Sequence, residues 1–107
     1  MIVVRIIMNV LPEKRKEVTQ TLLSIIKIGK KVERQNLSYD VLCCVEDINV
    51  FNLISTWETR KHLENYLKSD RFSVLLGTKS LLCEPLDIQI FTISKLEGFE
   101  FVKYVRK

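Results

Sequence analysis

The sequence predicts one α+β domain in which helices cover one face of an antiparallel sheet. The chain has 107 residues, enough for one domain and too few for two. Apolar residues recur at strand spacing in some segments and at helical spacing in others. These segments follow one another as β-α-β-β-α-β, which is the split βαβ or ferredoxin-like pattern.

The first strand and the long helix after it account for the N-terminal third. Ile2 to Val10 is rich in β-branched residues, as strands are. Pro12 suits a first helical position, and the helix should run from about Pro12 to Arg34. Its apolar residues fall on one side at helical spacing, and Gly29 weakens its last turn. That side consists of Val18, Leu22, Ile25, Ile26, Gly29 and Val32.

A hairpin and a short helix should follow. Leu37 to Val45 and Val50 to Trp57 are predicted strands, and the polar residues between them are typical of a short turn. Thr59 is a plausible cap for a helix over about Arg60 to Lys68.

The remaining segments complete the order. A further helical turn is expected around Phe72 to Leu76, with Gly77 as its stop. Pro85 precedes a last strand, Leu86 to Ser94. The tail 96–107, in which Phe99 to Val105 mixes aromatic residues and valine with charge, should form an edge strand or an arm that reaches a partner. All 107 residues thus belong to one domain.

The strands are apolar on both sides, which predicts self-association. Ile2, Val4 and Ile6 share one face of the first strand with Met8 and Val10. Val3, Ile7 and Leu11 share the other face with Arg5 and Asn9. An antiparallel sheet with two apolar faces needs a cover on each, and the helices supply one. We expect a homodimer in which a second copy of the sheet supplies the other.

Composition excludes several classes of partner. The hydrophobic and charged fractions, 47% and 28%, are ordinary for a globular domain. The net charge of +4 is mild and its basic clusters are interrupted by glutamate, so no nucleic-acid surface is expected. No run approaches the roughly 18 apolar residues that span a bilayer, and the N-terminus lacks the features of a signal peptide. We expect a cytoplasmic protein with no membrane partner.

The cysteines and the histidine do not predict a metal site. Cys43, Cys44 and Cys83 show no CxxC spacing, and buried reduced thiols are the favoured interpretation. His62 lies roughly 90° from the apolar side of its helix. A solvated or helix-end histidine is favoured there over a general base.

Polar and aromatic residues at covered positions are the candidate site residues. Asn9 and Arg5 interrupt an apolar strand face, where a structural partner or a ligand must satisfy them. Trp57 ends a central strand, where it either fills the core or offers its one donor to a ligand. Tyr66 faces the same interior from the next helix, and its hydroxyl needs a partner or a wet cavity.

The stretch from Trp57 to Phe72 resembles a motif of the antibiotic biosynthesis monooxygenase family, in the dimeric α/β barrel superfamily. There a strand ending in tryptophan leads into a helix of the form E-x-x-x-x-L-x-x-H, followed by S-x-x-F. Here the motif reads Trp57-Glu58, Leu63, Tyr66, Ser69 and Phe72, with Tyr66 in place of the histidine. The resemblance covers Ile2 to about Ile93.

The resemblance implies a small monooxygenase that uses no metal or flavin cofactor and oxidises an aromatic, phenolic substrate. Asn9, Trp57 and Tyr66 would orient the phenolate as catalytic residues. Arg5, His62 and Phe72 would bind the substrate.

Two alternatives stay open. The first is a non-catalytic dimeric binding module for a small hydrophobic molecule. The second is a relative of the family branch that binds haem. Asn9 and Tyr66 match that branch, but Val74 to Gly77 stands where its histidine ligand is expected.

Overall fold

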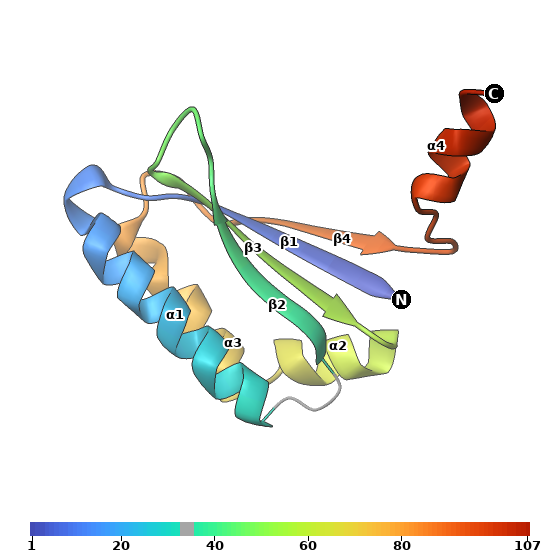
Figure 1. The fold of residues 1–107 in the computed structure, drawn as a ribbon. Helices are drawn as coiled ribbons and strands as arrows, with labels where there is room; N and C mark the ends of the chain where they lie inside the picture. Colours follow the sequence, from blue (N-terminus) through green and yellow to red (C-terminus); the bar gives the residue numbers. More distant parts are fainter. Residues whose placement is uncertain (33–35) are drawn as a thin grey trace.

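The computed structural model describes residues 1–32 and 36–107. Its sheet has four antiparallel strands in the order β2-β3-β1-β4. The strands are β1 (Ile2–Asn9), β2 (Asn36–Cys43), β3 (Val50–Trp57) and β4 (Asp87–Thr92). Figure 1 shows three helices on one side of this sheet, namely α1 (Arg15–Val32), α2 (Arg60–Leu67) and α3 (Asp70–Leu76). The predicted ferredoxin-like α+β fold is confirmed.

Local sequence signals set most element boundaries. The Thr59 side chain accepts a hydrogen bond from the backbone of His62 and caps α2, as predicted. Ser69 caps α3 in the same way, so that helix begins at Asp70 rather than at Phe72. Pro12 opens a short 3-10 helix, η1 (Pro12–Lys14), and α1 starts after it. The expected end of this helix at Arg34 lies outside the described residues.

Gly77 ends α3 without reversing the chain direction. Its φ of −66° is helical, and the backbone continues into a second 3-10 helix, η2 (Gly77–Leu81). The prediction of a stop at Gly77 is therefore right for the α-helix. No left-handed turn is needed there, because the chain stays on the helix side of the sheet.

The core lies between the sheet and the helices. Ile2, Val4, Ile6 and Met8 of β1 are buried on the helix side, and β3 contributes Phe51, Leu53 and Trp57 beside them. From α1, Val18, Leu22 and Ile25 pack into the same cluster.

The other face of the sheet is open. Val3, Ile7 and Ile54 are half-buried there, among the polar side chains of Arg5 and Asn52. The predicted division of β1 into two faces is confirmed, and the helices cover only one of them (Figure 1).

The structure corrects two predictions. The tail is not a strand, because Phe99–Val105 forms a helix, α4, which stands apart from the sheet (Figure 1). Alternation of apolar and charged residues over so few positions fits a helical face as well as a strand. The cysteines are unpaired, but Cys43 and Cys83 are exposed rather than buried. Both lie beside loops at strand ends, where the core does not reach.

Candidate functional site

An aromatic cluster at the junction of β2, β3, α2 and α3 brings together three of the predicted site residues. The rings of Trp57 and Tyr66 lie with centroids 4.7 Å apart and planes tilted by 30°. Phe72 meets Tyr66 edge-to-face at 5.5 Å, and Tyr39 of β2 meets it at 6.1 Å. All four side chains are buried. Such contacts each stabilise a core by about 0.5–1.5 kcal/mol beyond area burial.

Two hydrogen bonds satisfy polar atoms inside this cluster. The hydroxyls of Tyr39 and Tyr66 are hydrogen-bonded to each other. The indole Nε1 of Trp57 donates to Ser55 Oγ at 2.9 Å. Since indole has only this one donor, Trp57 can offer a ligand its ring face but no hydrogen bond.

Within the part of the chain that the structure describes, the tyrosine pair retains one unused donor. Burial raises the pKa of Tyr39, and the neighbouring Tyr66 raises it further. Burial also raises the pKa of Tyr66, although the hydrogen bond from Tyr39 opposes this. Both hydroxyls therefore stay protonated at neutral pH. The pair has two hydroxyl protons, and the hydrogen bond between the hydroxyls uses one of them. The other proton can be donated to an oxygen atom of a ligand.

Ser69 and Gly29 hold the cluster in place. Ser69 Oγ donates to the backbone oxygen of Tyr66 at 2.6 Å and accepts from the backbone N–H of Phe72 at 3.3 Å. One serine thus sets the angle between α2 and α3 and places both aromatic rings. On the other side, a Cβ on Gly29 would lie 3.9 Å from the Tyr39 ring, so α1 approaches β2 closely here.

Asn9 and Arg5 do not join the cluster. Asn9 pairs with Val50, whereas Trp57 pairs with Ile2 at the other end of β1. Both polar residues also point to the open face, away from the helices. Asn9 therefore lies at the opposite end of β1 from the position that pairs with Trp57, and on the opposite face of the sheet from Trp57 and Tyr66.

His62 lies in the first turn of α2 and is half-buried, in agreement with its predicted flanking position. Its Nδ1 is buried and has no hydrogen-bond partner among the described residues.

Sequence reasoning missed Tyr39 and Ser55. Tyr39 occupies an inward position of β2, and Ser55 is a polar residue on the inward face of β3. Alternation along each strand could have indicated both positions. The contact between Tyr39 and Tyr66 joins residues 27 apart, and only tertiary packing creates it.

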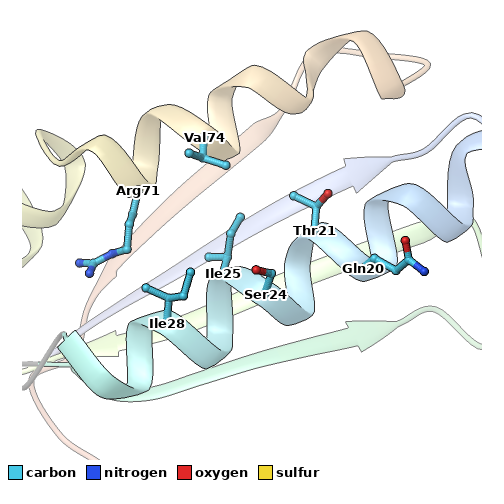
Figure 2. Close-up of a pocket in the computed structure, with 7 residues that line it drawn as sticks. All are labelled: Gln20, Thr21, Ser24, Ile25, Ile28, Arg71 and Val74. Atoms are coloured by element: carbon cyan, nitrogen blue, oxygen red, sulfur yellow. The ribbon is translucent and has the colours of Figure 1, made fainter.

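A groove of about 330 Å³ runs between α1 and α3. Figure 2 shows Ile25, Ile28, Ser24, Thr21 and Gln20 of α1 facing Arg71 and Val74 of α3. Its floor is apolar and its rim carries hydroxyl, amide and guanidinium groups. The helices that form the groove also form the cluster, through Gly29 beside Tyr39 and Phe72 beside Tyr66.

A second, smaller groove of about 240 Å³ lies at the far end of β1. Asn9, Asn49 and Cys83 line it together with acidic side chains. Asn9 therefore borders a solvent-accessible hollow, although one distant from the aromatic cluster.

The ligand set of the haem-binding branch is incomplete among the described residues. Val74 lines the groove and Leu75 is buried, so neither offers a ligand where the haem-binding branch needs histidine. Within residues 1–32 and 36–107, no three His, Cys, Asp or Glu side chains are grouped to hold a metal. No described helix is both long and apolar enough to cross a membrane.

The fold defines a class, the small ferredoxin-like α+β proteins with helices on one face of an antiparallel sheet. Solved structures of this class include a Nitrosomonas europaea protein named for antibiotic biosynthesis monooxygenases, which is 18% identical with a TM-score of 0.80 over 89% of this chain and 100% of that one. A Deinococcus radiodurans protein of the same name is 16% identical with a TM-score of 0.82 over 92% and 97%. A conserved Methanosarcina mazei protein is 23% identical with a TM-score of 0.77 over 84% and 89%.

These identities are low, so the structural similarity shows the fold alone. No curated protein sequence matches the chain. The sequence profile of the antibiotic biosynthesis monooxygenase family matches residues 1–75, which run from β1 to the last turn of α3 and include the whole aromatic cluster. The chain belongs to the antibiotic biosynthesis monooxygenase family, and a monooxygenase-like function is supported at the level of that family.

Proposed function

We propose that this protein is a cofactor-independent monooxygenase acting on an electron-rich aromatic substrate, a phenol or a quinol. The observation that carries the proposal is the unused hydroxyl donor of the Tyr39–Tyr66 pair, held against the ring of Trp57. A neutral tyrosine hydroxyl in an apolar interior is a strong donor to a phenolate oxygen. Trp57 would stack on the substrate ring, and Phe72 would close its far side.

In this reaction the substrate itself is the reductant. A CH₂ group activated by phenolic rings loses a proton to water, and the carbanion passes its electrons to O₂. The substrate carbon becomes a carbonyl, one oxygen atom enters the product and the other leaves as water. The substrate supplies all four electrons, and no external reductant is needed. The tyrosine pair would stabilise the phenolate in which the carbanion charge is delocalised.

The groove between α1 and α3 is the proposed binding route. It offers apolar walls and a polar rim, the usual composition of a site for small aromatic molecules. Trp57 is fully buried, so the substrate must displace Phe72 or part of α3 to reach it. This displacement also moves Leu75, which is fully buried in the core, so the substrate's own contacts must offset the packing lost from α3.

Oxygen uptake tests the proposal. We expect the purified protein to consume O₂ with a dihydroxyanthrone, whose CH₂ group is activated by phenolic rings, and Tyr66→Phe to lower kcat by about 10²-fold or more. Tyr104→Phe, on the exposed tail, is the matched control and should leave kcat unchanged. Asn9→Ala should also have little effect, because Asn9 lies far from the cluster. Equal rates for Tyr66→Phe and Tyr104→Phe would refute the assigned site.

A non-catalytic binding module is the second candidate, and the closed interior favours it. Trp57 and Tyr66 are almost completely buried, and each already has a hydrogen-bond partner. Saturable binding of the same aromatic probes without O₂ consumption would establish this function instead.

We also propose that the protein is a homodimer whose open sheet faces stack on each other. Arg5 and Asn9 would then lie at the interface rather than in the site. Its three free cysteines fit the proposed cytoplasmic location, because that compartment is reducing.

A further inference from the structure

The C-terminal arm (residues 94–107) exposes more apolar surface than a soluble domain usually leaves uncovered. None of the side chains of α4 is buried, and Phe99, Tyr104 and Val105 are each more than 60% exposed. Leu96, in the segment before α4, is 81% exposed. Figure 1 shows α4 standing beyond the end of β4, away from α1, α2 and α3.

Among the described residues, the ion pairs and cation–π contacts of the arm join residues of the arm to one another. Lys95 pairs with Glu97 at 2.8 Å and Lys103 with Glu100 at 3.5 Å. The Lys103 ammonium also lies 5.7 Å from the centre of the Phe99 ring. Seven helical residues are too few to form a stable helix alone in water. A covering surface must therefore stabilise α4.

The helix has one apolar side. At 100° per residue, Phe101, Val102, Tyr104 and Val105 project within one broad arc. Glu100, Lys103 and Arg106 project opposite them, together with Phe99 at the first position of the helix. This amphipathic pattern matches a helix that lies on a flat apolar surface with its charges toward water.

The edge strand β4 provides a surface of that kind. Ile88 and Ile90 pair with Ile6 and Val4 and so point toward the helix side of the sheet. Ile6 and Val4 are 2% and 1% exposed, whereas Ile88 and Ile90 are 38% and 42% exposed. The helices thus cover β1 but stop short of β4. An uncovered apolar edge strand invites a second chain.

The size of the exposed surface fits a dimer. The chain has 7453 Å² of accessible surface, whereas a compact monomer of 12.6 kDa should have about 6200 Å². The excess, roughly 1200 Å², exceeds the roughly 800 Å² that each partner buries in a standard interface. The radius of gyration, 15.6 Å, is likewise above the roughly 13 Å of a compact domain of this length.

We propose that α4 of one copy packs its apolar side on β4 of a second copy, and that the exchange is reciprocal. The backbone N–H of Ile93 is hydrogen-bonded to Met1 at 2.9 Å, so the arm starts from a fixed point and leads outward past its own β4. Each chain has one arm and one β4 surface. A dimer with two-fold symmetry can therefore place each arm on the β4 surface of its partner. The inference rests on the dimer proposed above and not on the oxygenase chemistry.

Sedimentation velocity over a dilution series tests the exchange. We expect Phe101→Asp with Val105→Asp to raise the dimer dissociation constant at least tenfold. Glu100→Gln with Lys103→Gln, on the polar side of α4, is the matched control and should leave it unchanged. Far-UV circular dichroism should show the body folded in both variants, since α4 contributes nothing to its core.

A crosslink gives an independent readout. With Cys43, Cys44 and Cys83 replaced by serine, a mixture of the Val105→Cys and Ile90→Cys chains should form a covalent heterodimer on oxidation. Lys103→Cys in place of Val105→Cys should not.

Three results would overturn the inference. If the Phe101→Asp/Val105→Asp chain dimerises as tightly as the parent, the arm exchange is excluded but the sheet-stacked dimer is not. If the parent chain is monomeric at all concentrations, both the arm exchange and the sheet-stacked dimer are excluded. Binding of a monomeric parent to phosphatidylserine vesicles, lost in the arm variant, would assign the arm to a lipid surface instead.

Discussion

At the scale of single residues, the Tyr39–Tyr66 pair is the most unusual feature of the interior. Both rings are buried, and each hydroxyl finds its partner in the other. Removal of one hydroxyl would leave the other buried without its partner, at a cost of about 1–3 kcal/mol. Removal of both hydroxyls leaves two phenyl rings and no unpaired polar group at these positions. The pair therefore stabilises the fold only as a pair, while its spare proton is available to a ligand.

The raised pKa values predict how stability depends on pH. The ordinary tyrosine pKa is 10.0, and burial raises it for Tyr39 and Tyr66 in the folded state. Above pH 10 the unfolded chain loses these protons first, so the free energy of unfolding should fall as pH rises. The slope should reach about 1.4 kcal/mol per pH unit for each tyrosine. Urea denaturation between neutral and alkaline pH measures it.

The double variant Tyr39→Phe with Tyr66→Phe should flatten this alkaline loss without leaving a lone hydroxyl. Tyr104→Phe on the exposed arm should retain it. An unchanged slope in the double variant would assign the alkaline loss to other groups.

At the scale of elements, the turn between α2 and α3 decides where the aromatic rings lie. Ser69 bonds to the backbone of both Tyr66 and Phe72, and it is the N-cap of α3. α2 is capped separately by Thr59. Two short helices with independent caps can hold a sharp angle that one long helix could not. That angle brings Phe72 against Tyr66.

We predict that Ser69→Ala lowers the free energy of unfolding by about 1 kcal/mol, through the loss of an N-cap, and perturbs the packing of Phe72. Ser73→Ala, one turn later and exposed, removes only a long hydrogen bond to Ser69 and should cost less than about 0.5 kcal/mol. Urea denaturation measures both values, and near-UV circular dichroism reports the aromatic packing. Equal effects of the two changes would contradict the assigned role of Ser69.

At the scale of the whole molecule, the helix layer covers only part of the sheet. One face carries α1, α2 and α3 (Figure 1). The other carries half-buried Val3, Ile7 and Ile54, and no described helix covers it. β4 is uncovered on the helix side as well. These surfaces and the arm explain why the accessible area is large for the mass.

We predict that Ile54→Asp weakens the dimer at least tenfold, because it places an unpaired charge in the middle of the stacked sheets. Analytical ultracentrifugation measures the dissociation constant. Ser73→Asp, on the exposed side of α3, is the control and should have no effect. If Ile54→Asp dimerises like the parent, the open sheet face is not the interface, and the arm would have to hold the dimer alone.

Much of the fold could be predicted because its signals are local. The alternation in Val50–Trp57 predicted β3 to the residue, and Thr59 predicted the start of α2. The α3 start was missed because Ser69 was not recognised as a cap. The tail was predicted to be an edge strand or an arm that reaches a partner, and its helix was not predicted, since seven residues carry too little periodicity to decide.

The candidate site was predicted in part. Trp57, Tyr66 and Phe72 do meet, since one continuous stretch of chain carries them. Asn9 was grouped with them although its face of β1 points the other way, and the alternation of that strand already indicated this. Tyr39 was not predicted at all, because it comes from a strand whose register with β3 only the assembled sheet reveals.

The amino-acid sequence alone determined the element order, the division of β1 and β3 into two faces and the family motif, because periodicity, caps and turns act over a few neighbouring residues. Tertiary structure alone decided that Tyr39 is hydrogen-bonded to Tyr66, that Asn9 lies apart from Trp57, and that α4 has no cover among the described residues. Those facts depend on strand register and on how far the helices extend over the sheet, and both are set by the packing of the entire core.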